Sequence, residues 1–254
     1  MPRILVIVPA PVSGQQLELR KAQVGVAALP EDVEVDFRAV RASADNQVSH
    51  HDYALSEICI LEAGLTAEEE GYDAICIDTV SDSGVNTLRS MLDIPVVGPG
   101  RTTYLVALML SNRFSVVTMW DKWKPLVKKT LTDLQMLDRC ASIRAIGIEP
   151  DTRGLLDGKE DETFAKMLET ARLCIDEDGA EVICLGSTTM HDAAEFLKSK
   201  LEVPVINPGP LSYQVASALA RLRLAQSRSA WPSPVKPKED MIHAMIEAAT
   251  AFTK

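Results

Sequence analysis

Short apolar segments bounded by glycine or proline recur along the chain and are its clearest pattern. These segments occupy residues 3–8, 71–79, 95–100, 113–118, 179–187 and 204–209. Each is a run of apolar, mostly β-branched residues without regular polar alternation, which is typical of a strand covered on both faces in a parallel sheet. The pattern therefore predicts two sets of three buried strands.

The two sets are copies of one another. Residues 71–79 (GYDAICIDT) align without a gap with residues 179–187 (GAEVICLGS), at an offset of 108 residues. The other two strands of the first set match those of the second at offsets of 109 and 110 residues. Three matches in the same order and nearly the same phase indicate an internal duplication.

Helical patterns lie between the strands. Residues 55–70 and 163–177 carry apolar side chains at helical spacing and end before Gly71 and Gly179, which act as stop signals. Alternating strands and helices give right-handed crossovers. We therefore predict an α/β fold of two pseudosymmetric, doubly wound parallel-sheet domains, with the active site between them.

The tail sets the predicted domain boundaries. Residues 211–225 and 239–252 are predicted to form helices that return to the first half. The first domain is then residues 1–98 plus 209–254, and the second is residues 99–208. The segment 227–238, rich in proline and serine, is expected to be a surface loop, with a mobile flap as the alternative.

Composition excludes several classes of function. A net charge of −10 without a basic stripe argues against nucleic acid as a partner. The longest apolar runs are strand-length, so no membrane segment is expected. Five dispersed cysteines show no metal-ligand spacing, which favours reduced thiols in the cytoplasm and predicts no metal site.

The duplicated strands locate the expected chemistry. Ligands of parallel sheets bind beyond the carboxyl ends of the strands, where helix N-termini present free N–H groups. Both tips, residues 78–84 and 186–192, are dense in hydroxyl groups. Thr79 and Ser187 are equivalent in the two halves, so we expect them to face each other across one cleft. Helix capping is the alternative role for any one of these hydroxyls.

Hydroxyls and backbone N–H groups together suit a carboxylate or an oxyanion that develops during a reaction. The predicted ligand is therefore a small carboxylate or amide. The residues predicted to bind it are Val80, Ser81, Ser83, Gly84, Thr188 and Thr189 in the tips, Pro9 and Ser13 after the first strand, Thr118 and Trp120 after the strand at 113–118, and His51 and Pro210.

The same residues resemble the aspartate/glutamate/hydantoin racemase superfamily, especially its hydantoin racemase branch. The likeness rests on residues 3–8, on GYDA at 71–74 followed by DSG at 82–84, on IPVVG at 94–98, on RFSVVT at 113–118 and on VICLGS at 182–187. It spans nearly the whole chain. The resemblance implies a cofactor-independent site between two pseudosymmetric domains, and relatives that racemise or isomerise small acids and hydantoins or decarboxylate malonates. It also implies a homo-oligomer.

The chain departs from that family at the reacting groups. Racemases of the family use one cysteine from each half to remove and return a proton, but Thr79 and Ser187 occupy the matching positions here. Without a dedicated partner neither hydroxyl becomes a base as readily as a thiol. Asp78 or Asp82 could act as the base if buried, with capping of the following helix as the favoured role for Asp82. His191 with Ser187 could form a nucleophilic pair on one helix face.

The sequence-based hypothesis is a racemase or isomerase acting at the α-carbon of a small carboxylate or cyclic amide. Two alternatives remain open at this point. One is a hydrolase or carbon–carbon lyase that uses the same anion site with Ser187 or water, and the other is a non-catalytic binding protein for small acids.

Overall fold

The computed structural model describes residues 1–149 and 160–252. Its strands form two four-stranded parallel sheets. The first has the order β2 (Glu34–Ala39), β1 (Arg3–Val8), β3 (Ala74–Ile77), β4 (Val96–Val97). The second has the order β6 (Cys140–Ala145), β5 (Phe114–Thr118), β7 (Val182–Leu185), β8 (Val205–Ile206). The predicted α/β fold with two pseudosymmetric halves is confirmed.

Each sheet contains one strand that the repeat did not reveal. These are β2 and β6, each of which lies at one edge of its sheet and pairs with one neighbour. Their side chains are mostly half-buried rather than buried, and their sequences, EVDFRA and CASIRA, mix charged and apolar residues. An edge strand needs no continuous apolar run, because its faces are less covered than those of a central strand.

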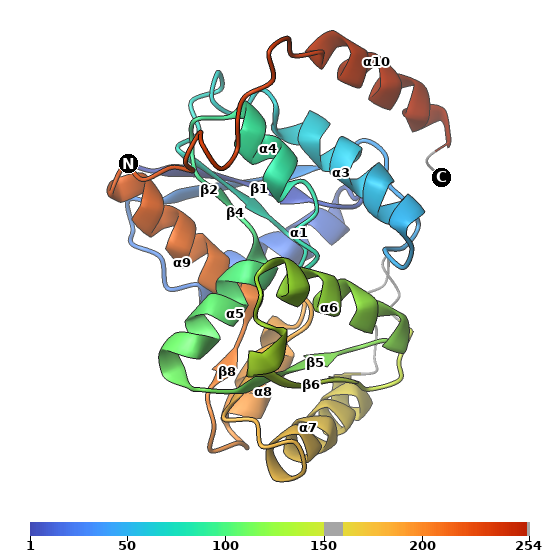
Figure 1. Ribbon diagram of the computed structural model, residues 1–254, viewed down its shortest axis with the longest axis vertical. Coiled ribbons are helices and arrows are strands. Elements are labelled where there is room, and N and C mark those ends of the chain that lie inside the picture. Colours follow the sequence, from blue (N-terminus) through green and yellow to red (C-terminus); the bar gives the residue numbers. More distant parts are fainter. Residues whose placement is uncertain (150–159, 253–254) are drawn as a thin grey trace.

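Helices cover both faces of each sheet, as a doubly wound layout requires (Figure 1). In the first half, α3 (His50–Gly64) and α4 (Val85–Met91) pack on one face, and α2 (Gln23–Val26) and α9 (Pro208–Arg221) pack on the other. In the second half, α7 (Glu160–Asp176) and α8 (His191–Lys198) oppose α5 (Pro99–Leu110) and α6 (Lys124–Asp133).

Helices α5 and α9 join the halves. Each begins with a proline directly after the last strand of its set, so the two are equivalent in the duplication. They pack against one another at the waist of the molecule (Figure 1). Tyr213 of α9 packs in the core of the first half, and Tyr104 of α5 packs in that of the second. The boundaries of the domains stay a prediction.

The remaining elements are short or peripheral. Helix α1 (Gln15–Lys21) follows β1, and η1 (Asp121–Trp123) and η2 (Leu137–Arg139) flank α6. Helix α10 (Glu239–Ala249) lies against α3 through Ile246 and leads into η3 (Thr250–Phe252). Within the described ranges, no helix combines the length and the apolar character needed to cross a membrane.

The segment 227–238 is attached to the first half away from the cavity described below. Arg228 donates to the backbone oxygen of Arg89 at 2.9 Å, and the Trp231 ring lies 4.7 Å from the Arg89 guanidinium carbon. The segment contributes no residue to the wall of that cavity. In this arrangement it is a surface loop, and the flap alternative stays a prediction.

Candidate active site

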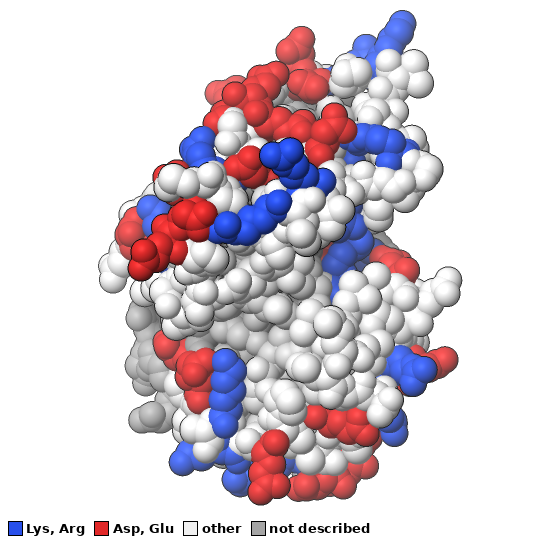
Figure 2. All heavy atoms as spheres, turned by 90° about the vertical axis from the view of Figure 1, so that its left-hand side faces the viewer, with Lys and Arg blue, Asp and Glu red and all other residues white. Residues whose placement is uncertain are grey.

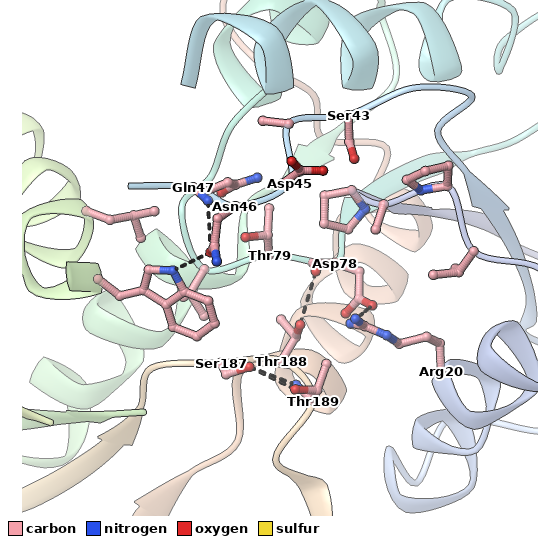
Figure 3. Close-up of a pocket in the computed structure, with 18 of the residues that line it drawn as sticks. Arg20, Ser43, Asp45, Asn46, Gln47, Asp78, Thr79, Ser187, Thr188 and Thr189 are labelled. Carbon is pink, nitrogen blue, oxygen red and sulfur yellow. Dashed lines mark hydrogen bonds and ion pairs between the residues drawn. The ribbon is translucent and has the colours of Figure 1, made fainter. Parts of the chain in front are cut away.

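A cavity of about 480 Å³ lies between the two halves, at the carboxyl ends of the strands. Residues of both halves form its wall: Pro9, Ala10, Pro11, Val12, Gln16, Arg20, Ser43, Ala44, Asp45, Asn46, Gln47, Asp78, Thr79, Val80, Trp123, Leu126, Val127, Gly186, Ser187, Thr188, Thr189 and Phe252. In Figure 3 the Thr79 and Asn46 side chains lie on one side and Ser187 on the other. The two equivalent turns therefore face one shared space.

The turn after β3 is held by a chain of hydroxyl groups. The Thr79 Oγ1 lies 3.2 Å from the Ser81 Oγ, which in turn lies 2.9 Å from the Ser83 Oγ. Ser81 and Ser83 are buried behind the turn and do not line the cavity. Thr79 alone of these three hydroxyls reaches the cavity, and the other two fix its position.

The turn after β7 repeats this arrangement. The Ser187 Oγ lies 3.0 Å from the Thr189 Oγ1 and accepts a hydrogen bond from the Thr189 backbone N–H at 3.3 Å. Thr188 instead donates from Oγ1 to the backbone oxygen of Asp78 at 3.1 Å (Figure 3). That bond ties the two turns together, since its partners are 110 residues apart.

A buried ion pair stands beside the Thr79 turn. Arg20 of α1 donates from one guanidinium nitrogen to the Asp78 Oδ2 at 2.9 Å, and the two side chains are 10% and 0% exposed. Burial raises the pKa of Asp78, while Arg20 opposes that rise. The buried carboxylate of Asp78 neutralises Arg20, and the predicted role of Asp78 as a base stays a prediction. Sequence reasoning missed Arg20, which sits in an ordinary amphipathic segment.

Asp82 corrects the sequence-based expectation. Its carboxylate accepts hydrogen bonds from the backbone N–H groups of Gly100 and Arg101, both at 2.8 Å, and pairs with the Arg101 Nε at 3.2 Å. Burial raises the pKa of Asp82, and Arg101 opposes that rise. Asp82 does not line the cavity. It caps α5 rather than α4, the helix that follows it in sequence. A catalytic role for Asp82 stays a prediction.

The Ser187–His191 pair stays a prediction. Ser187 lies in the turn before α8, so the two residues do not share a helix face. His191 begins α8, but its side chain falls outside the described residues.

Four predicted binding residues, Pro9, Val80, Thr188 and Thr189, line the cavity. Six others do not. Ser13 and His51 are exposed elsewhere, and Trp120 lies against Lys122. Thr118 and Pro210 are buried, and Gly84 starts α4 with φ of 80°, packed on Ile60. Packing explains these positions, because strand ends and helix starts also supply core contacts.

The wall includes groups that the sequence did not point to. Residues 43–47 follow β2, and the rule that ligands bind beyond strand ends would have placed them here had β2 been recognised. The Asn46 Oδ1 accepts a hydrogen bond from the Trp123 Nε1 of the second half at 3.2 Å. The exposed Phe252 at the end of the described chain also borders the cavity.

No thiol, imidazole or ammonium group belongs to the described cavity wall. Cys76 and Cys184 are fully buried inside their strands, and burial raises the pKa of both thiols. The described residues contain no group of three or more His, Cys, Asp or Glu side chains placed to hold a metal ion. The wall therefore offers hydroxyl, amide and backbone groups, with one accessible carboxylate at Asp45.

Comparison with known proteins gives a consistent family. A family model described as Asp/Glu/Hydantoin racemase matches residues 4–216. A hydantoin racemase of Pseudomonas sp. (strain NS671) is 35% identical over 63% of this chain and 63% of its own length. A hydantoin racemase of Rhizobium meliloti is 30% identical over 70% of this chain and 72% of its own length. The chain thus spans less than two thirds of the Pseudomonas protein.

Comparison with solved structures gives the same two-domain fold. An allantoin racemase from Klebsiella pneumoniae superimposes with a TM-score of 0.84 at 27% identity, covering 93% of this chain and 95% of that one. Arylmalonate decarboxylase superimposes with a TM-score of 0.61 at 16% identity, covering 87% and 93%, and shares the fold alone. The family model covers most of the chain, and the allantoin racemase superposition extends over 93% of it. This chain belongs to the Asp/Glu/hydantoin racemase family.

Proposed function

We propose that the protein inverts the configuration at the α-carbon of a small, neutral cyclic amide of the hydantoin or allantoin kind by removing and returning the α-proton, without a cofactor. The observation that carries this proposal is the cavity between the two equivalent turns, with the Thr79 and Ser187 hydroxyls on its wall. Family relatives that are hydantoin and allantoin racemases support the choice of ring. The pairing of Arg20 with Asp78 supports the choice of a neutral ligand.

A small carboxylate would need a cation on the wall. Arg20 is the one cationic side chain among the described wall residues, and its charge is matched by the buried carboxylate of Asp78. Asp45 adds a negative charge to the wall, which would repel a carboxylate ligand. A neutral amide fits this wall better than a dicarboxylate, because it needs hydrogen bonds but no counter-ion.

The Thr79 and Ser187 hydroxyls stabilise negative charge on the substrate oxygen and do not remove the proton themselves. When the α-proton leaves a cyclic amide, its electron pair moves toward the neighbouring carbonyl, and the oxygen becomes negative. Donors placed around that oxygen lower the barrier, and a dry site strengthens them. Asp45 is the accessible carboxylate on the wall and is therefore our candidate for the group that takes the proton.

The test is incubation of single enantiomers of 5-substituted hydantoins and of allantoin in heavy water. We expect loss of the α-proton NMR signal and loss of optical rotation, with replacement of one carbon-bound hydrogen by deuterium as the only change in composition. The variant T79A/S187A should lose at least about 100-fold in rate, as expected for removed charge-stabilising donors. The matched control T132A/S90A removes two helix-surface hydroxyls that bond to backbone oxygens outside the cavity, and should keep full activity.

Other outcomes would overturn the proposal. A new product of different mass would identify a hydrolase or carbon–carbon lyase. Tight binding without exchange would identify a binding protein.

A third variant, T79C/S187C, should raise the exchange rate, because a thiol with a pKa near 8.5 forms a thiolate base far more readily than a hydroxyl forms an alkoxide.

A homo-oligomer and a cytoplasmic location stay predictions. Large apolar side chains of α5 are exposed, among them Leu105, Met109 and Leu110. Figure 2 shows the face that carries α5 and α9, with charged side chains gathered above and below a mostly uncharged middle. This supports contact between copies of the chain through that face.

A further inference from the structure

The amide of Asn46 is held in one orientation. Its Oδ1 accepts hydrogen bonds from the Trp123 Nε1 and from the Gln47 backbone N–H, both at 3.2 Å. An indole N–H and a backbone N–H can only donate, so the oxygen must face them. The Nδ2 group is thereby turned away from both partners.

The Asn46 Nδ2 is available for a ligand. None of the described residues accepts a hydrogen bond from it, and Asn46 lines the cavity. Figure 3 shows the Asn46 amide next to Thr79 and on the side of the cavity opposite Ser187. A fixed, unused N–H donor on the wall of a cavity is the kind of group that stabilises developing charge.

The bond that fixes this amide crosses between the halves. Asn46 belongs to the loop after β2, whereas Trp123 belongs to η1 at the start of α6, 77 residues further on. Both side chains are half-buried on the cavity wall. The Asn46 Nδ2 group is therefore held in this orientation only while the two halves are arranged so that Trp123 contacts Asn46.

We propose that Asn46 donates from Nδ2 to the substrate carbonyl oxygen beside the reacting carbon, and that Trp123 is a positioning residue for it. The inference rests on the proposed function and names a residue of the same site. In the step, the α C–H bond breaks and its proton goes to the base. The electron pair forms a C=C bond while the carbonyl oxygen becomes negative, and return of a proton to carbon reverses both changes. The Asn46 N–H stabilises the negative oxygen between these events.

The first test is N46D, which keeps the oxygen that Trp123 and Gln47 bond to but removes the N–H donor. We expect kcat to fall by about 100- to 1000-fold, with KM changed much less, because the donor acts on charge that exists only during the reaction. The variant W123F keeps the ring and deletes its N–H, and should lower kcat by about 3- to 10-fold. The double variant N46A/W123F should be no slower than N46A, since both changes act through one amide.

The chain offers a matched control pair. The Trp231 Nε1 donates to the Asn86 Oδ1 at 3.3 Å, and neither residue lines the cavity. The variants N86D and W231F make the same chemical changes away from the site and should keep kcat within twofold. Far-ultraviolet circular dichroism and melting curves establish that each variant is folded.

Calorimetric binding of unsubstituted hydantoin separates this inference from the proposed function. N46D should weaken hydantoin binding at least fivefold, as loss of one hydrogen bond implies. If the wild type exchanges no α-proton but shows this loss, only the proposed function falls. If the wild type is active and N46D stays within twofold in kcat and in hydantoin affinity, only the Asn46 inference falls. Failure of the wild type to bind hydantoin would overturn both.

Discussion

Replacement of Asp82 by alanine should destabilise the fold and thereby test the correction made to its role. The Asp82 side chain is 3% exposed, and it satisfies two backbone N–H groups at the start of α5. The variant would leave those groups and the 15% exposed Arg101 guanidinium without their carboxylate. Removing one partner of a buried charged pair costs about 3 to 5 kcal/mol. Total stabilities are about 5 to 15 kcal/mol, so the loss would be large.

The assay is urea unfolding followed by circular dichroism, with D82A compared with E68A. Glu68 is a matched control, since its Oε1 also accepts two backbone N–H groups, of Asp93 and Ile94 at 2.7 and 2.8 Å, but with access to solvent. Water can replace a lost acceptor there, so E68A should cost only about 1 kcal/mol. A D82A protein with wild-type stability and abolished catalysis would refute the reasoning and support a catalytic role for Asp82.

Two further predictions concern titration and thiol reactivity. Partial burial raises the pKa of Asp52, but hydrogen bonds from the Ser49 and Val48 backbone N–H groups outweigh it and lower that pKa from 3.8 to about 2. Asp52 should therefore add about 1 to 2 kcal/mol to the free energy of unfolding above pH 4, and this contribution is lost as the pH falls toward 2. The variant D52N should abolish this pH dependence in acid unfolding curves. A D52N curve identical to that of the wild type would contradict the prediction. Native protein treated with iodoacetamide at pH 8 should keep Cys76 and Cys184 unmodified and its activity intact, because both thiols are fully buried; mass spectrometry showing either one labelled in active protein would contradict this.

The sequence by itself determined the architecture and the position of the cavity. Apolar strands covered on both faces show their pattern over four to six residues, and a duplication repeats that pattern at a constant offset. Because ligands of parallel sheets bind at the strand ends, the equivalent positions Thr79 and Ser187 could be placed on one cavity before any coordinates. The edge strands β2 and β6 escaped because their mixed composition carries no comparable signal.

Only the tertiary structure decided what each polar residue does. Asp78 and Asp82 look alike in sequence, four residues apart, yet one neutralises Arg20 and the other caps α5. The Asn46 amide is aimed by Trp123 from the opposite half. These partners lie 18 to 77 residues apart along the chain. Local patterns report which face of an element is buried, whereas the partner of a side chain depends on how the elements pack in three dimensions.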